Sequence, residues 1–253
     1  IFYFSEDDIW VTNICAPIHW DGNEWTLYHL ENMGLDVCAG YSCWGTSSEN
    51  MYFVGLYGSI AHYDGTSFIQ MESGHEVDLW DIHGTPDGEH VFATGFNYSG
   101  DLSGHSVVLQ LLNGSWNTLY YSDQYMHEND STGAVLSGYV YQDTAYFPRK
   151  GGLWKYNYLT EASTIIPTDE IGMGGHDWFR IIVNGINDIF MKDGSFSTLH
   201  FNGYSWYKDT NVSDYYGWWG THGNKFDYYN DMLVTVGCID CSFGRAIVNK
   251  GLR

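Results

Sequence analysis

A short hairpin motif that recurs along the whole chain constrains the fold more than any other feature of the sequence. An apolar segment followed by Asp or Asn, and usually by Gly, occurs at Asp21, Asp64, Asn113, Asn157, Asn202 and Asn249. Successive copies lie 43, 49, 44, 45 and 47 residues apart. A period of about 45 residues is typical of repeat proteins whose unit is a four-stranded sheet.

The chemistry of the motif predicts tight hairpin turns. Asp-Gly and Asn-Gly pairs tolerate the positive φ angles of such turns. These pairs begin at Asp21, Asp64, Asn113 and Asn202, and an aromatic follows at Trp25, Phe68, Trp116 and Trp206. The copy at Asn157 has neither the Gly nor the aromatic, which predicts a longer turn there.

A second recurring pattern has the same period as the hairpin motif, because two further apolar strands precede each hairpin. Six four-stranded units fit the chain, at approximately residues 1–30, 40–71, 77–121, 134–166, 177–208 and 215–253. A single meander cannot bury both of its faces, whereas radially packed units can. We therefore expect one all-β domain over 1–253, a six-bladed β-propeller of four-stranded antiparallel blades. A β-sandwich of irregular hairpins is the alternative.

The last unit is expected to be incomplete. Its first strand is predicted at residues 216–221, and its third strand, "RAIVNKG", leaves no residues for a fourth. The last blade should therefore lack its outer strand unless a segment upstream of Ile1, or a strand donated by a partner, completes it.

The segment from Cys43 to Phe68, "CWGTSSENMYFVGLYGSIAHYDGTSF", resembles the blade repeat of secreted bacterial β-propellers. Their pattern runs roughly WGSSxxDV(W/Y)xVGxxGxIxH(W/Y)DGxxW, and the terminal "AIVNKGLR" is similar to their closing strand. The resemblance implies a secreted or surface-attached propeller of unassigned activity, and it brings no catalytic residues with it.

Charge narrows the choice of partners. The chain has 31 Asp and Glu against 10 Lys and Arg, a net charge of −21. Such a surface repels phosphate backbones, so nucleic acid is not an expected partner. No apolar run is long enough to predict a transmembrane segment.

Cysteines and sequons add weaker signals. Among the five cysteines, "CIDC" predicts a disulfide between Cys238 and Cys241, with inert thiols, a redox pair or half of a zinc site as alternatives. Asn-x-Ser sequons, which are glycosylation sites only in a eukaryotic secretory setting, occur at Asn97, Asn113, Asn129 and Asn211.

Candidate ligand-binding residues lie before the first strands of three adjacent units. In a propeller these loops share one face with the loops between second and third strands. The residues are His75, Glu76, His127, Glu128, His176, Asp177 and Trp178, with His105 from a long inserted loop. Imidazoles and carboxylates converging there could hold a divalent cation, a cationic ligand or a sugar. Solvated turn residues are the alternative interpretation, and no cofactor is predicted.

A second histidine set, His19, His62 and His200, belongs to the repeat itself and is expected to be structural. The sequence favours a non-catalytic binding or structural module, extracellular or on the cell surface, with a glycan or protein partner. A hydrolase or lyase using the histidine-rich face is one alternative. A component of a surface filament or layer is another.

Overall fold

The computed structural model describes residues 1–13, 15–98, 100–123, 133–149, 151–172, 180–192, 198–208, 221–229, 232–239 and 245–252. Within these ranges the chain forms five four-stranded sheets and one three-stranded sheet. In every sheet the strands are neighbours in chain order and each pair is antiparallel. The predicted all-β fold of four-stranded antiparallel sheets is thus confirmed.

The first three sheets occupy the N-terminal half of the chain. The first contains β1 (Phe2–Ser5), β2 (Asp8–Asn13), β3 (Ala16–Trp20) and β4 (Trp25–Leu27), followed by the 3₁₀ helix η1 (Leu30–Met33). The second contains β5 (Cys38–Ser47), β6 (Asn50–Leu56), β7 (Ile60–Tyr63) and β8 (Phe68–Met71). The third contains β9 (Leu79–Gly84), β10 (Val91–Phe96), β11 (Ser106–Leu112) and β12 (Ser115–Ser122).

The remaining three sheets follow in the same way. The fourth contains β13 (Tyr139–Tyr141), β14 (Thr144–Arg149), β15 (Gly152–Asn157) and β16 (Ala162–Pro167), followed by α1 (Thr168–Ile171). The fifth contains β17 (Arg180–Gly185), β18 (Asp188–Lys192), β19 (Thr198–Phe201) and β20 (Trp206–Lys208). The sixth contains β21 (Thr221–Tyr229), β22 (Met232–Ile239) and β23 (Arg245–Leu252).

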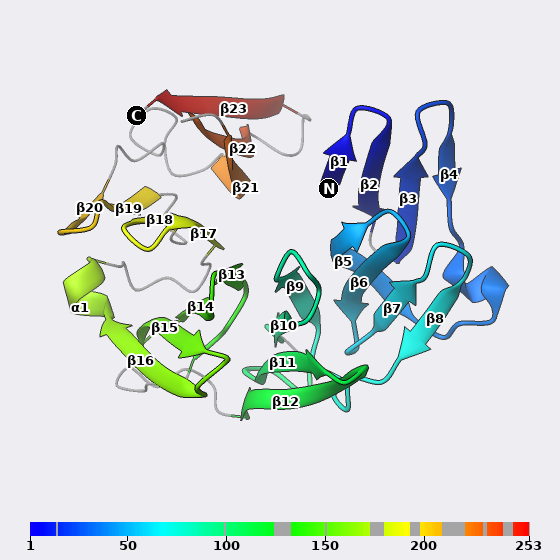
Figure 1. Cartoon of the computed structure of the whole chain (residues 1–253), viewed down its shortest axis with the longest axis horizontal. Coiled ribbons are helices and arrows are strands. Elements are labelled where there is room, and N and C mark those ends of the chain that lie inside the picture. Colours follow the sequence, from blue (N-terminus) through cyan, green and yellow to red (C-terminus); the bar gives the residue numbers. More distant parts are fainter. Residues whose placement is uncertain are drawn as a thin grey trace.

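Figure 1 shows the sheets arranged around a common centre, with the first strand of each sheet innermost. The sixth sheet lies between the fifth and the first in this view. Its inner strand is described from Thr221, whereas residues 216–220 of the strand predicted at 216–221 lie outside the described ranges, so that prediction is untested there. In the described part of the chain the helices have four residues each, far short of the length that spans a bilayer.

Buried apolar side chains fill the spaces between successive sheets. Four clusters in the described residues each combine side chains from two neighbouring sheets. Representative pairs from these clusters, in chain order, are Trp10 with Phe53, Val54 with Leu79, Phe92 with Phe147, and Leu153 with Ile189. Each of the first five meanders therefore packs apolar side chains against a neighbouring meander, as expected for a repeat of this kind.

The hairpin turns use the motif differently from the prediction. In the first sheet the turn has four residues, and Asp21 Oδ1 accepts hydrogen bonds from the backbone N–H groups of Asn23 and Glu24 at 2.8 and 2.9 Å. Asp64 and Asn202 make the same pair of bonds. The acidic or amide side chain thus caps the turn, and the following glycine supplies the positive φ, +89° at Gly22.

The turns at Asn113 and Asn157 differ from these three. Asn113 and Gly114 both have positive φ, 52° and 76°, and form the tight two-residue turn that the sequence predicted. The turn after Asn157 was predicted to be longer than the others. It has four residues between the paired Asn157 and Ala162, the same number as the turn of the first sheet, so the prediction was wrong. Asn157 caps it through Oδ1, and Glu161 rather than a glycine takes the positive φ of 58°.

The repeated histidines make the same contacts in three sheets. His19, His62 and His200 each place Nε2 within 2.7 to 3.0 Å of Oδ1 of an Asp or Asn on the second strand, namely Asp8, Asn50 and Asp188. Each ring also stacks on the aromatic directly opposite it, with centroid distances of 4.2, 4.3 and 4.1 Å to Trp10, Tyr52 and Phe190. These contacts agree with the structural role predicted for the set.

The contact between Asp188 and His200 gives a test of that role. Asp188→Ala removes an acceptor 2.7 Å from His200 Nε2 at a site where the two side chains are only 11% and 9% exposed. A buried polar group left without its partner costs roughly 1–3 kcal/mol. We expect the free energy of unfolding, measured by urea denaturation, to fall by that amount. Asp188→Asn, which keeps an acceptor, should lose less. A loss no larger than that of Asp7→Ala, at an exposed turn, would contradict the structural role.

Candidate functional site

A polar pocket lies where loops of the second sheet meet the entry to the third. It has a volume of about 380 Å³ and is lined by residues 36–37, 57–59 and 70–76. Its lining includes the exposed carboxylates of Asp36, Glu72 and Glu76 and contains no Lys or Arg. We call it the acidic pocket. Predicted site residues His75 and Glu76 both line it.

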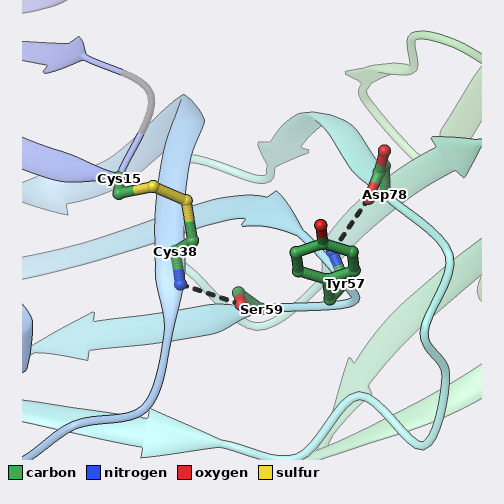
Figure 2. The surroundings of a disulfide bond; sticks show 5 residues. All are labelled: Cys15, Cys38, Tyr57, Ser59 and Asp78. Carbon is green, nitrogen blue, oxygen red and sulfur yellow. Dashed lines mark hydrogen bonds between the residues drawn. A yellow bond between two sulfur atoms is a disulfide. The ribbon is translucent and has the colours of Figure 1, made fainter.

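Hydrogen bonds from backbone N–H groups to side-chain oxygens hold the wall of the acidic pocket in place (Figure 2). Tyr57 N donates to Asp78 Oδ1 at 2.8 Å, and Cys38 N donates to Ser59 Oγ at 3.0 Å. Between them Gly58 has a φ of +68°, and a Cβ there would lie 1.8 Å from the backbone oxygen of His75. The turn that forms this wall therefore requires glycine.

A disulfide that the sequence interpretation missed braces the same wall. Cys15, in the turn between β2 and β3, is bonded to Cys38 at the start of β5 (Figure 2). In a propeller the loops between second and third strands lie on the same face as the entries to the first strands. Cys15 and Cys38 occupy these two positions, so the repeat could have indicated that they lie on the same face. The predicted pair is untested, because Cys241 and the side chain of Cys238 lie outside the described residues. Cys43 is buried.

His75 and His105 are connected through Tyr121. His75 Nε2 lies 2.8 Å from Thr118 Oγ1, and its ring stacks on Tyr121 at a centroid distance of 5.1 Å. The Tyr121 hydroxyl lies 2.7 Å from His105 Nδ1. Burial lowers the pKa of His75, so the imidazole is mainly neutral at pH 7. These contacts join the inserted loop to the edge of the acidic pocket.

The other predicted site residues, His127, Glu128, His176, Asp177 and Trp178, lie outside the described residues. In the part of the chain that is described, no three His, Cys, Asp or Glu side chains are grouped so that they could hold a metal ion. Of the sequons, Asn113 lies in an exposed turn, and Asn97 Oδ1 accepts a hydrogen bond from Asp78 N at 2.7 Å. Asn129 and Asn211 lie outside the described ranges.

A larger cavity, of about 770 Å³, lies at the centre of the molecule and was not predicted. Its wall includes residues of β5, β9, β13 and β17, the innermost strands of four sheets, and of β1 and β2 (Figure 1). Asp81 Oδ2 lies 3.3 Å from Arg180 Nη1, and Asp81 Oδ1 accepts a hydrogen bond from Ser42 Oγ at 3.1 Å. The charged residues Asp81 and Arg180 in otherwise apolar first strands could have indicated this cavity from the sequence.

His83 occupies the same cavity wall. Its Nδ1 accepts a hydrogen bond from Val140 N at 3.2 Å, and its ring stacks on Tyr139 at 4.1 Å. Burial lowers the pKa of His83 to about 4, although the Asp81 carboxylate opposes the shift. At neutral pH the ring is therefore uncharged, with its proton on Nε2.

Comparisons with known proteins identify the fold and no family. No protein-family model matches the chain. No curated protein matches it. A solved structure of YCF48 bound to D1 peptide is 13% identical and covers 99% of this chain and 76% of its own, with a TM-score of 0.68.

Two further solved structures are similar. The extracellular domain of the putative hybrid two-component system BT3049 from B. thetaiotaomicron is 12% identical with a TM-score of 0.61, over 94% of this chain and 33% of its own. The WD40 beta propeller domain of Doa1 is 8% identical with a TM-score of 0.53, and the match covers 86% of this chain and 70% of that domain's chain. At these identities the likeness shows the fold alone, and the fold is that of a β-propeller.

The pKa of His83 predicts acid sensitivity. In the unfolded chain the imidazole titrates near 6.5, so below about pH 6.5 the unfolded chain binds a proton that the folded chain does not bind until about pH 4. Stability therefore falls as the pH drops through that window, and we expect a contribution of up to about 3 kcal/mol. His83→Phe should flatten the dependence, measured by urea denaturation at a series of pH values. If the free energy of unfolding depended on pH equally in both proteins between pH 6.5 and 4, the lowered pKa of His83 would not be its cause.

Proposed function

We propose that the chain is a non-catalytic binding module, extracellular or on the cell surface, in which the acidic pocket receives a basic segment of a protein partner. The observation that carries this proposal is the composition of the pocket wall. It presents Asp36, Glu72 and Glu76 around a rigid turn and contains no basic side chain apart from His75.

The net charge of the molecule also favours a basic peptide as the ligand. With a net charge of −21, the chain attracts cationic segments over a distance before contact is made. Lys or Arg side chains in the pocket would then meet carboxylates, and the 74% exposed ring of Tyr57 offers a face for a cation–π contact. One similar solved structure, that of YCF48, has a bound peptide, which supports a peptide as the ligand class.

The geometry of a serine, histidine and aspartate group supports a role without catalysis. Ser48 Oγ lies 3.1 Å from His19 Nε2, and Asp8 Oδ1 lies 3.0 Å from the same nitrogen. In a hydrolase triad the serine and the carboxylate contact opposite ring nitrogens, so this group lacks the relay geometry. Trp10 Nε1 also donates to Ser48 Oγ at 2.7 Å, which further ties the hydroxyl to the scaffold.

The disulfide supports the proposed location. Bonds such as Cys15–Cys38 persist in oxidising compartments and are rare where thiols are kept reduced. The similar domain of BT3049 is an extracellular one. Thiol labelling of the protein in its native compartment tests the location, because both cysteines should resist labelling until a reductant is added.

We also infer that the sheets close into a single six-bladed ring over residues 1–253. The sixth sheet, which Figure 1 places between the fifth and the first, has three strands in the described ranges where the others have four. A strand from an upstream or partner segment would pair with the outer edge of β23, as in strand complementation. An experimental structure with five or seven blades, or with the edge of β23 bare in the intact protein, would contradict this inference.

Peptide binding tests the function directly. We expect the chain to bind arrayed peptides rich in Lys and Arg in preference to neutral or acidic peptides, and to bind more weakly as salt rises. A triple variant, Asp36→Asn with Glu72→Gln and Glu76→Gln, should weaken binding at least tenfold. The matched control, Glu6→Gln with Glu24→Gln and Glu49→Gln, changes the net charge equally at exposed positions outside the pocket and should change affinity less than twofold.

Three outcomes would overturn the proposal. Equal weakening by the two triple variants would mean that overall charge, and not the pocket, attracts the peptide. Equal binding of acidic and basic peptides would remove the charge argument. Binding to a glycan array but to no peptide, with the binding abolished by the pocket variant, would replace the peptide by a carbohydrate ligand.

A further inference from the structure

The central cavity has the dimensions of a small-molecule site. Its volume of about 770 Å³ lies within the range of ligand pockets, roughly 300 to 1,000 Å³. Its wall is built mainly on the innermost strands of the sheets rather than on loops (Figure 1). Side chains held on strands keep their geometry without a ligand, which lowers the cost of binding one.

The ion pair in the wall leaves most donors of Arg180 unused. A guanidinium has five N–H donors in a planar fork. Within the described residues, Arg180 meets a carboxylate through Nη1 alone, at 3.3 Å from Asp81 Oδ2. The two side chains are 25% and 20% exposed, so both are largely removed from bulk water while still reaching the cavity. A second acceptor placed against the guanidinium would satisfy the donors that remain.

Strand β9 adds a neutral donor on the same side. Asp81 and His83 are two residues apart on β9, so both side chains face the same side of the sheet. Because His83 Nδ1 accepts from Val140 N, the proton of the neutral ring is on Nε2. The cavity wall therefore offers a cation, an anion and an uncharged N–H donor.

We propose that the central cavity binds a small zwitterion, a molecule with one carboxylate and one ammonium group such as a free amino acid. The carboxylate is bound by the remaining donors of Arg180 and by His83 Nε2–H. The ammonium group lies against the carboxylate of Asp81. The aromatic residues Tyr41 and Tyr139, which also line the cavity, cover the apolar part of the ligand.

Charge selects the zwitterion over simpler ions. A free anion is repelled by a chain with a net charge of −21. A simple cation pairs with Asp81 but is repelled by Arg180, and it leaves the donors of the guanidinium unsatisfied. A zwitterion has no net charge to repel and presents each sign to the opposite sign in the wall.

This site is independent of the acidic pocket. The pocket is lined by residues 36–37, 57–59 and 70–76, and the cavity shares none of them. Loss of one activity therefore does not require loss of the other, and the acidic-pocket triple variant serves as a control for the cavity.

Calorimetric titration of the intact chain with each of the twenty common L-amino acids tests the proposal. We expect at least one to bind with a Kd below about 1 mM. The amide of that amino acid, which lacks the carboxylate, and its N-acetyl form, which lacks the ammonium group, should each bind at least tenfold more weakly. If no amino acid binds, or if either single-charge form binds as well as the parent, the proposal is wrong.

Variants of the cavity wall locate the site. Arg180→Gln and Asp81→Asn should each weaken binding at least tenfold, whereas the acidic-pocket triple variant should change the Kd less than twofold. Arg180→Lys keeps the charge beside Asp81 but loses the planar fork, so it decides the question if Arg180→Gln does not fold. A folded Arg180→Lys protein should bind at least threefold more weakly. Unchanged binding by folded Arg180→Lys and Asp81→Asn proteins would overturn the proposal.

Discussion

The fold depends on the need of each four-stranded meander to cover its apolar surface with a neighbour. The buried clusters show this directly, since each mixes side chains from two successive sheets, as Phe53 does with Trp10 and Leu153 with Ile189. Burial of one aromatic or aliphatic side chain contributes about 1.5–3 kcal/mol. No sheet could retain that contribution alone, so the arrangement around a common centre follows from the repeat.

Local features of the fold could be predicted from the sequence, because hairpins and alternating strands depend on neighbouring residues. The turns at Asp21 and Asp64 were located correctly, although the side chain caps the turn where a left-handed Asp had been expected. The first strand predicted for the sixth unit, at residues 216–221, stays a prediction, because only Thr221 of that segment is described.

Features that join distant segments were harder to predict. His75 and Glu76 line the acidic pocket, but they are adjacent in the chain, and their predicted convergence with residues of the next two units stays a prediction because those residues lie outside the described ranges. The pairing of Asp81 with Arg180 could not be assigned, since the two strands belong to the third and fifth sheets and meet only across the cavity. The outer loops thus carry one candidate site and the inner strands another, on a scaffold that holds both.

The covalent link between Cys15 and Cys38 also has a mechanical consequence. Tension applied at Ile1 can peel away β1 and β2, but beyond Cys15 the load passes through sulfur to β5 in the second sheet. Strands β3 and β4 lie inside the covalent loop and are shielded from that pull. A pull applied at Ile1 would therefore release about fourteen residues, at roughly 3.4 Å each, before the load reaches the second sheet.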